Sequence, residues 1–270
     1  MILLHLVLLG LYGIAAWALW PIPASATGSA RTRWPSWTPW VIPIALVLHG
    51  SLAAADIVAR DGLDLSFGNA LSVVAGLAAL IAYTTGLMRT LPRMAAVVLP
   101  TAGIFSLLPV FMNNPHRFAY AEAPWAAAHV ALALLAYALF IVAALQALVL
   151  MGLEKRLHRG LPDPAASDLP PLLTLERFLF RLIGLAFVLL TLTVASGVFF
   201  SEEIFGRPLT FNHKTVFSIL AWVVFGALLL GRERYGWRGR IALRWILTGT
   251  TFLLLAYLGS KFVLEVLLHR

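Results

Sequence analysis

Long runs of apolar residues, separated by short polar segments, make up most of the chain. A run of about 20 residues is long enough to cross a hydrocarbon core of ~30 Å as an α-helix. The runs are continuous rather than alternating and contain scattered Gly and Pro, which excludes a membrane β-barrel. We therefore predict an all-α integral membrane protein, a single domain of about eight transmembrane helices. The predicted spans are residues 2–20, 38–59, 66–88, 94–112, 123–151, 176–200, 213–230 and 242–268.

Composition agrees with this pattern. The 270 residues are 61% hydrophobic and 12% charged, with a mean hydropathy of +0.89. A soluble domain of this length needs far more polar surface. The first apolar run has no basic segment before it, so we expect a retained helix rather than a cleaved signal peptide. The Pro-rich segment 152–175 is predicted to be a cytoplasmic linker.

The positively charged residues indicate an orientation. Loops that follow the first, third, fifth and seventh predicted helices carry Arg31, Arg33, Arg89, Arg93, Lys155, Arg156, Arg159, Arg232, Arg234, Arg238 and Arg240. Cytoplasmic loops are enriched in Lys and Arg, so both termini are predicted to be extracytoplasmic. The same loops account for the net charge of +8, and we expect no nucleic-acid partner. The absence of cysteine excludes disulfides, thiol redox chemistry and iron–sulfur ligation.

The seven histidines fall mostly on one side of this topology. His158 lies in the predicted linker, whereas His5, His116, His129, His213 and His269 fall near the outer side and His49 lies deeper. For His49 alone, a hydrogen-bonded helix contact is an equally open reading, and Asp56 follows it on the same helix face. Imidazoles that converge from separate helices are what a haem iron with two axial ligands needs.

The segment "FSEEIFGRPLTFNHKTVFSILAW", residues 200–222, carries a family resemblance. It resembles a degenerate form of the tryptophan-rich WWD signature of the cytochrome c assembly family (CcsA/CcmC type), with Phe or Leu in place of each signature tryptophan. "HVALALLAYALF" looks like the family's helix with an outer haem-ligand histidine, and "AYLGSKFVLEVLLH" looks like its last helix. The segment 200–215 is thus expected to be a WWD-like outer segment. The whole pattern is similar to the YpjD-like branch of eight-helix inner-membrane proteins.

The resemblance implies a non-covalent, b-type haem at the outer side of the membrane. His129 and His269 would ligate its iron axially, while His213 and His49 line the cavity or serve in alternative ligation. Aromatic rings would cover the porphyrin, and cationic side chains would bind the propionates. The remaining residues implied for these two roles are Phe200, Phe205, Phe211, Trp125, Arg207 and Lys214.

We therefore expect a haem-handling protein associated with cytochrome c assembly, a chaperone or transporter of haem rather than a catalyst. Its expected partners are haem, membrane lipid, and other assembly proteins or an apocytochrome, in a bacterial inner membrane. Two alternatives stay open. One is a secondary transporter, or an accessory subunit of an ion transporter, with His49 and Asp56 as an intramembrane relay. The other is a structural membrane scaffold.

Overall fold

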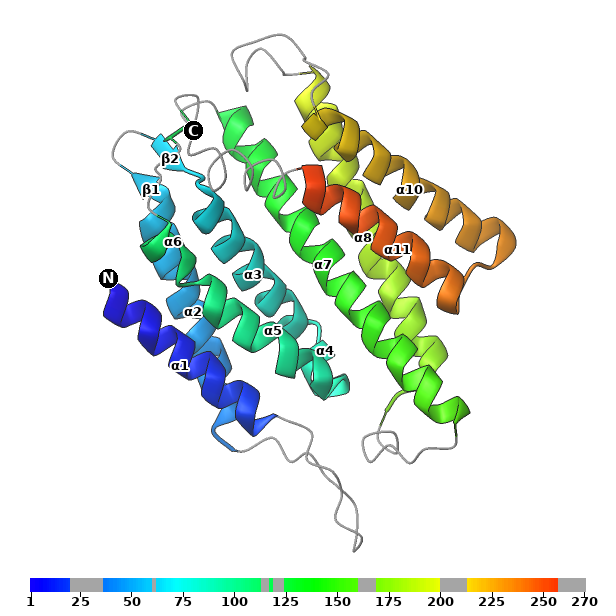
Figure 1. The fold of residues 1–270 in the computed structure, drawn as a ribbon, viewed down its shortest axis with the longest axis horizontal. Helices are drawn as coiled ribbons and strands as arrows, with labels where there is room; N and C mark the ends of the chain where they lie inside the picture. Colours follow the sequence, from blue (N-terminus) through cyan, green and yellow to red (C-terminus); the bar gives the residue numbers. More distant parts are fainter. Residues whose placement is uncertain are drawn as a thin grey trace, which may run out of the picture.

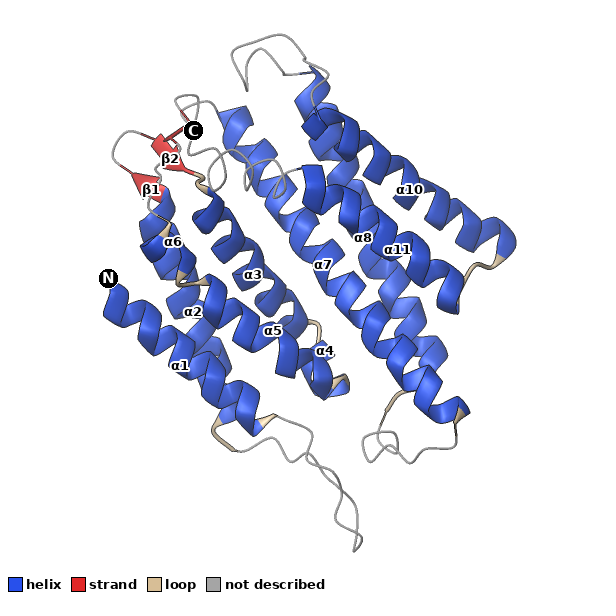
Figure 2. Ribbon diagram, in the orientation of Figure 1, coloured by secondary structure: helices blue, strands red, loops and turns tan. Residues whose placement is uncertain are grey.

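The computed structural model describes residues 1–19, 36–59, 62–112, 117–118, 124–159, 169–199 and 213–256. Figures 1 and 2 show a bundle of long helices with a small sheet at one end. The helices are α1 (Ile2–Ala18), α2 (Thr38–Ile57), α3 (Phe67–Thr84), α4 (Leu87–Thr90), α5 (Pro92–Phe105), α6 (Leu108–Phe111), α7 (Pro124–His158), α8 (Leu172–Phe199), α10 (His213–Tyr235) and α11 (Gly239–Leu254). The strands are β1 (Val58–Ala59), β2 (Gly62–Asp64) and β3 (Arg117–Phe118).

The long helices form two groups that meet along α3 and α7 (Figure 1). In the first group, α1 packs against α2 and α5, and α3 packs against α2 and α5. In the second group, α7 packs against α8 and α11, and α10 packs against α8 and α11. Alanines fill much of the core in both groups, since small side chains let membrane helices approach closely.

The helical membrane class predicted from the apolar runs is confirmed. Six segments in the described part of the chain are long and apolar enough to cross a membrane, one of them being α5 and α6 taken together, Pro92–Phe111. α1 is a shorter apolar helix, and α11 is described only to Leu254, short of the predicted end at 268. The count of eight transmembrane helices stays a prediction.

One predicted span, 94–112, is divided in the structure. α5 ends at Phe105, a turn follows at Ser106 and Leu107, and α6 resumes with Pro109 at its second position. Proline has no N–H to donate to the carbonyl four residues earlier, and its ring clashes with that carbonyl. The Ser106 hydroxyl bonds the Gly103 carbonyl at 2.7 Å within this turn.

The three-stranded antiparallel sheet was not predicted. β2 lies between β1 and β3, with Leu63 paired to Val58 and to Phe118. Strands of two or three residues are too short to show an alternating pattern, so the sequence gives no periodic signal for them. The sheet joins the end of α2 to the segment before α7.

The distribution of exposed and buried side chains suits lipid rather than water. Large apolar side chains face outward, as at Val47, which is 73% exposed, and Leu3, which is 70% exposed. Polar side chains such as His49, Ser72 and Gln146 are buried. A soluble protein shows the opposite arrangement, so the outward apolar faces indicate contact with hydrocarbon.

The two ends of the bundle differ in charge. The sheet end carries β1–β3, the beginnings of α1, α3, α7 and α10, and the side chain of Lys214. The arginine end carries Arg89, Arg93, Lys155, Arg156, Arg159, Arg232, Arg234, Arg238 and Arg240. α7 continues past the predicted boundary at 151 as far as His158, because residues 153–156 are the strong helix formers Leu, Glu, Lys and Arg and the last turn places cations at the negative end of the helix dipole.

Candidate functional site

His129 lies in the second turn of α7, at the sheet end, and contacts the last turns of α8. Its Nδ1 lies 2.8 Å from the hydroxyl of Ser196. The imidazole also packs closely on Gly197, where an added Cβ would lie 3.3 Å from His129 Cε1. The hydrogen bond to Ser196 and the close contact with Gly197 therefore position the ring against α8.

The hydrogen bonds of Ser196 bear on the tautomer of His129. In the arrangement in which Ser196 donates its single hydroxyl proton to the Thr193 carbonyl at 3.0 Å, it accepts from His129. Nδ1 of His129 then carries the proton, and the lone pair of the neutral ring is on Nε2. An imidazole whose N–H is bonded to a second group is the usual form of a metal-ligating histidine.

Other predicted site residues gather at the same end. Trp125 is one turn before His129 on α7 and is 59% exposed. His213 and Lys214 begin α10, with His213 exposed and Lys214 half-buried. The beginnings of α7 and α10 and the end of α8 lie together in Figure 1. The structure thus brings four of the predicted residues to one end of one helix group.

Aromatic side chains line the helix contacts deeper in this group. Phe217, one turn beyond His213, stacks on Phe252 of α11 with ring centroids 6.0 Å apart. Tyr137 donates to the Leu253 carbonyl at 2.6 Å, which joins α7 to the end of α11. These contacts order the helices beneath the sheet end, and none of them was singled out from the sequence.

Five predicted site residues lie outside the described part of the chain. They are Phe200, Phe205, Arg207, Phe211 and His269. The second axial ligand and most of the WWD-like segment, residues 200–215, are therefore still predictions.

His49 lies in the other helix group. Its Nδ1 is 3.2 Å from the Tyr12 hydroxyl and its Nε2 is 3.2 Å from the Ser72 hydroxyl. α2 packs against α1 and α3, whereas His129 contacts α8, so the structure does not bring the two histidines together. Asp56, the proposed relay partner of His49, is instead 3.5 Å from His5.

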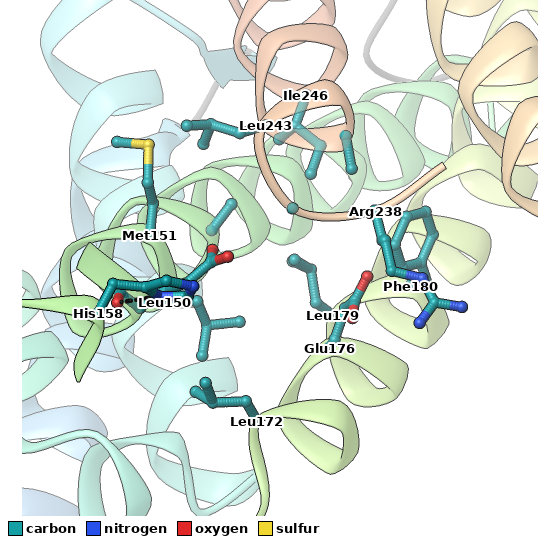
Figure 3. A pocket seen from close by; sticks show the side chains of 14 residues that line it. Leu150, Met151, His158, Leu172, Glu176, Leu179, Phe180, Arg238, Leu243 and Ile246 are labelled. Atoms are coloured by element: carbon teal, nitrogen blue, oxygen red, sulfur yellow. Dashed lines mark hydrogen bonds between the residues drawn. The ribbon is translucent and has the colours of Figure 1, made fainter. Parts of the chain in front are cut away.

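A cavity of about 240 Å³ lies at the arginine end, between α7, α8 and α11 (Figure 3). Its walls are largely apolar, with the carboxylate of Glu176 and the side chain of Arg238 at its rim. Glu176 accepts from Arg232 at 3.0 Å, and the Arg232 guanidinium lies 4.5 Å from the centre of the Phe180 ring. These contacts join α8 to α10, far along the bundle from His129.

In the described ranges, no three His, Asp or Glu side chains lie close enough together to hold a metal ion. A haem iron differs, because the porphyrin supplies four ligands and the protein adds one or two. A single oriented imidazole with aromatic and cationic neighbours fits that need.

Comparison with known proteins decides the family. The family described as "Cytochrome C assembly protein" matches residues 37–268. The chain belongs to this family. The resemblance that the segment 200–222 and its two companion helices suggested is confirmed.

Individual relatives agree with the family match. The inner membrane protein YpjD of Escherichia coli is 33% identical over 230 residues, which cover 83% of this chain and 85% of the relative. An uncharacterised 28.8 kDa protein of Azospirillum brasilense is 35% identical over 187 residues, 68% of this chain and 69% of that protein. The cytochrome c biogenesis protein CcsA of Gloeobacter violaceus is 32% identical over 92 residues, 34% of this chain and 27% of that protein. No solved structure matches this chain.

Proposed function

We propose that this membrane protein acts in cytochrome c biogenesis by binding haem at the sheet end, with His129 as an axial ligand. The observation that carries the proposal is the network at His129, where the Ser196 hydroxyl bonds Nδ1 and orients the ring. Family membership supports it, since the matching family is named for cytochrome c assembly.

The neighbouring residues suit the parts of haem that they would meet. Trp125, on the same face of α7 as His129, offers an aromatic surface to the porphyrin. Lys214 and His213 at the start of α10 offer donors to anionic propionates, and the positive end of the helix dipole adds to this attraction. His269 remains the proposed second ligand. The chain would bind and present haem, which we infer to be of b type, to an assembly partner or an apocytochrome.

Optical spectroscopy of protein purified after haem supply tests this proposal. The wild type is expected to retain haem and show a Soret band. Ser196→Ala removes the acceptor of the His129 N–H, so haem affinity should fall about 10- to 100-fold, as for other outer-shell partners of metal-ligating histidines. Haem titration followed by absorbance measures this change.

Two controls accompany that titration. Ser196→Thr keeps a hydroxyl at the same position and should retain the affinity. Thr193→Val removes a hydroxyl that bonds the Leu189 carbonyl on the same helix and keeps the backbone carbonyl that accepts from Ser196. Colourless wild-type protein, or equal affinities in Ser196→Ala and Thr193→Val, would contradict the role given to this network.

The proposed location is a bacterial inner membrane with the sheet end outward. The relative from Escherichia coli is named an inner membrane protein, and the cations gather at the other end of the bundle. Because the chain has no cysteine, a single introduced cysteine reports its own position. Phe199→Cys, at the end of α8, should react with a membrane-impermeant maleimide on intact spheroplasts. Tyr235→Cys, at the arginine end, should react only after permeabilisation, and the reverse pattern would invert the topology.

A further inference from the structure

The contact between α1 and α2 contains two polar layers. His5 of α1 lies opposite Asp56 of α2, and Tyr12 of α1 lies opposite His49 of α2. On each helix the two residues are seven apart, hence about two turns or ~10 Å along the axis. The antiparallel helices therefore form an outer layer, His5 and Asp56, at the sheet end. The inner layer, Tyr12 and His49, lies further along the helices and is hydrogen-bonded.

The two layers differ in how well their polar atoms are satisfied. In the inner layer both nitrogens of His49 have partners, and its ring packs on Gly76, where an added Cβ would lie 3.1 Å away. In the outer layer neither ring nitrogen of His5 has a hydrogen-bond partner, although His5 is 1% exposed. Oδ2 of Asp56 is also buried without a hydrogen bond.

The separation within the outer layer explains these unpartnered atoms. His5 Nε2 and Asp56 Oδ2 face each other at 3.5 Å. A charge-assisted hydrogen bond between such groups is about 2.7–2.9 Å long, so the two atoms are close but too far apart to form one. Ionisable groups within a membrane span are costly unless paired, and they mark sites for protons or ions.

Asp56 gives this pair a connection to the surface. It is 16% exposed although its Oδ2 is buried, and it lies one residue before the end of α2. Asn69 of α3 donates to the backbone carbonyls of Asp56 and Asp64, at 3.3 and 2.9 Å, which fixes the end of α2. A proton can therefore reach Asp56 from the sheet end without crossing the bundle.

The surroundings of the pair are otherwise simple. Among the described residues, the charged or titratable groups that act on Asp56, besides His5, are Asp64 and the amino group of Met1. His5 also acts electrostatically on His49. Between the two layers lie Leu8 of α1 and Leu52 of α2, both buried. This apolar layer separates His5 from Tyr12 and His49, so the outer pair does not continue into a chain of hydrogen bonds.

We propose that His5 and Asp56 form a proton-binding site at the sheet end, distinct from the His129 site. The first proton taken from solvent protonates His5 Nε2, which donates to the Asp56 carboxylate when the pair closes; a second, taken at lower pH, protonates Asp56 Oδ2, and both return to solvent as the pH rises. The apolar layer of Leu8 and Leu52 makes this a site of proton uptake and release rather than a path across the membrane. The proposal is independent of haem, because the pair lies in the other helix group.

Infrared difference spectroscopy on the full, haem-free chain tests the site. Spectra are compared between about pH 5 and pH 8, the range in which imidazole ordinarily titrates. The wild type should gain a protonated-carboxyl band at the acid side, and Asp56→Asn should lose it. His5→Gln should shift the midpoint of that band to higher pH by about one unit or more, because the carboxylate loses the positive partner that favours its ionised form. Glu233→Gln, an exposed acidic residue at the arginine end, should leave the band unchanged.

Two results would overturn the proposal. The band persisting in Asp56→Asn would place the proton elsewhere, and an unmoved midpoint in His5→Gln would show that Asp56 titrates without His5. If Asp56→Asn does not fold, protein labelled with ¹³C at the aspartate carboxyls supplies the same measurement. A label-sensitive band whose midpoint moves in His5→Gln then supports the pair, and one that does not move overturns it.

Discussion

Protein in which His129 is replaced by alanine is expected to lose the Soret band of the haem-supplied wild type. The substitution removes the imidazole nitrogen that we propose as a ligand of the haem iron. No neighbouring residue on α7 is another histidine. The helix itself should persist, because α7 packs against α3, α8 and α11 along most of its length. Absorbance of the purified variant, normalised to protein, measures the loss.

His158→Ala is the matched control for this experiment. It removes a histidine from the same helix at the arginine end, where His158 is exposed and bonds the Glu154 carbonyl at 2.9 Å. The control variant should bind haem as the wild type does. Equal haem content in His129→Ala and His158→Ala would remove His129 from the site, and loss in both would point to a general effect on the fold.

Gly249→Ala is expected to destabilise the second helix group by about 1–3 kcal/mol, the usual cost of overpacking. A Cβ on Gly249 of α11 would lie 2.7 Å from Cε2 and Cζ of Phe225 on α10. That ring cannot retreat, because it stacks on Phe140 of α7 with centroids 3.8 Å apart and both rings are 0% exposed. Thermal unfolding in detergent should show a lower midpoint.

Two further variants separate this steric effect from the general effect of a Gly→Ala change. Gly184→Ala, on α8, meets no atom within 4 Å and should be neutral or stabilising by up to ~1 kcal/mol through helix propensity. Phe225→Leu should partly rescue Gly249→Ala, so the two changes should be non-additive. Matching midpoints for Gly249→Ala and Gly184→Ala would contradict the close packing of α10 on α11.

The sequence predicted His129 as a site residue but gave no sign of its hydrogen-bond partner. Ser196 is 67 residues away, in a run of small residues at the end of α8. Serine in a membrane helix commonly bonds its own backbone, as Ser196 also does, so its type alone does not point to a histidine. Only the packing of α7 on α8 brings the two side chains together.

The pairing of polar residues in the first helix group is a second such case. The spacing of His49 and Asp56 on one helix face correctly indicated two polar groups directed the same way. His49 bonds Tyr12 of α1 and Asp56 faces His5 of α1, because α1 runs antiparallel to α2 in one register. A shift of α1 by one turn would separate these partners, and no local pattern in the sequence excludes that shift.

The sequence by itself determined that the chain is a helical membrane protein, where most spans lie, and which family it belongs to. Apolar runs predict helical spans because backbone N–H and C=O groups in the hydrocarbon core must be hydrogen-bonded within the segment itself. The tertiary structure alone decided that His129 meets Ser196, that His5 meets Asp56, and that His49 stays in the other helix group. Those contacts depend on how close-packed helices face each other, which is a property of whole surfaces rather than of any one segment.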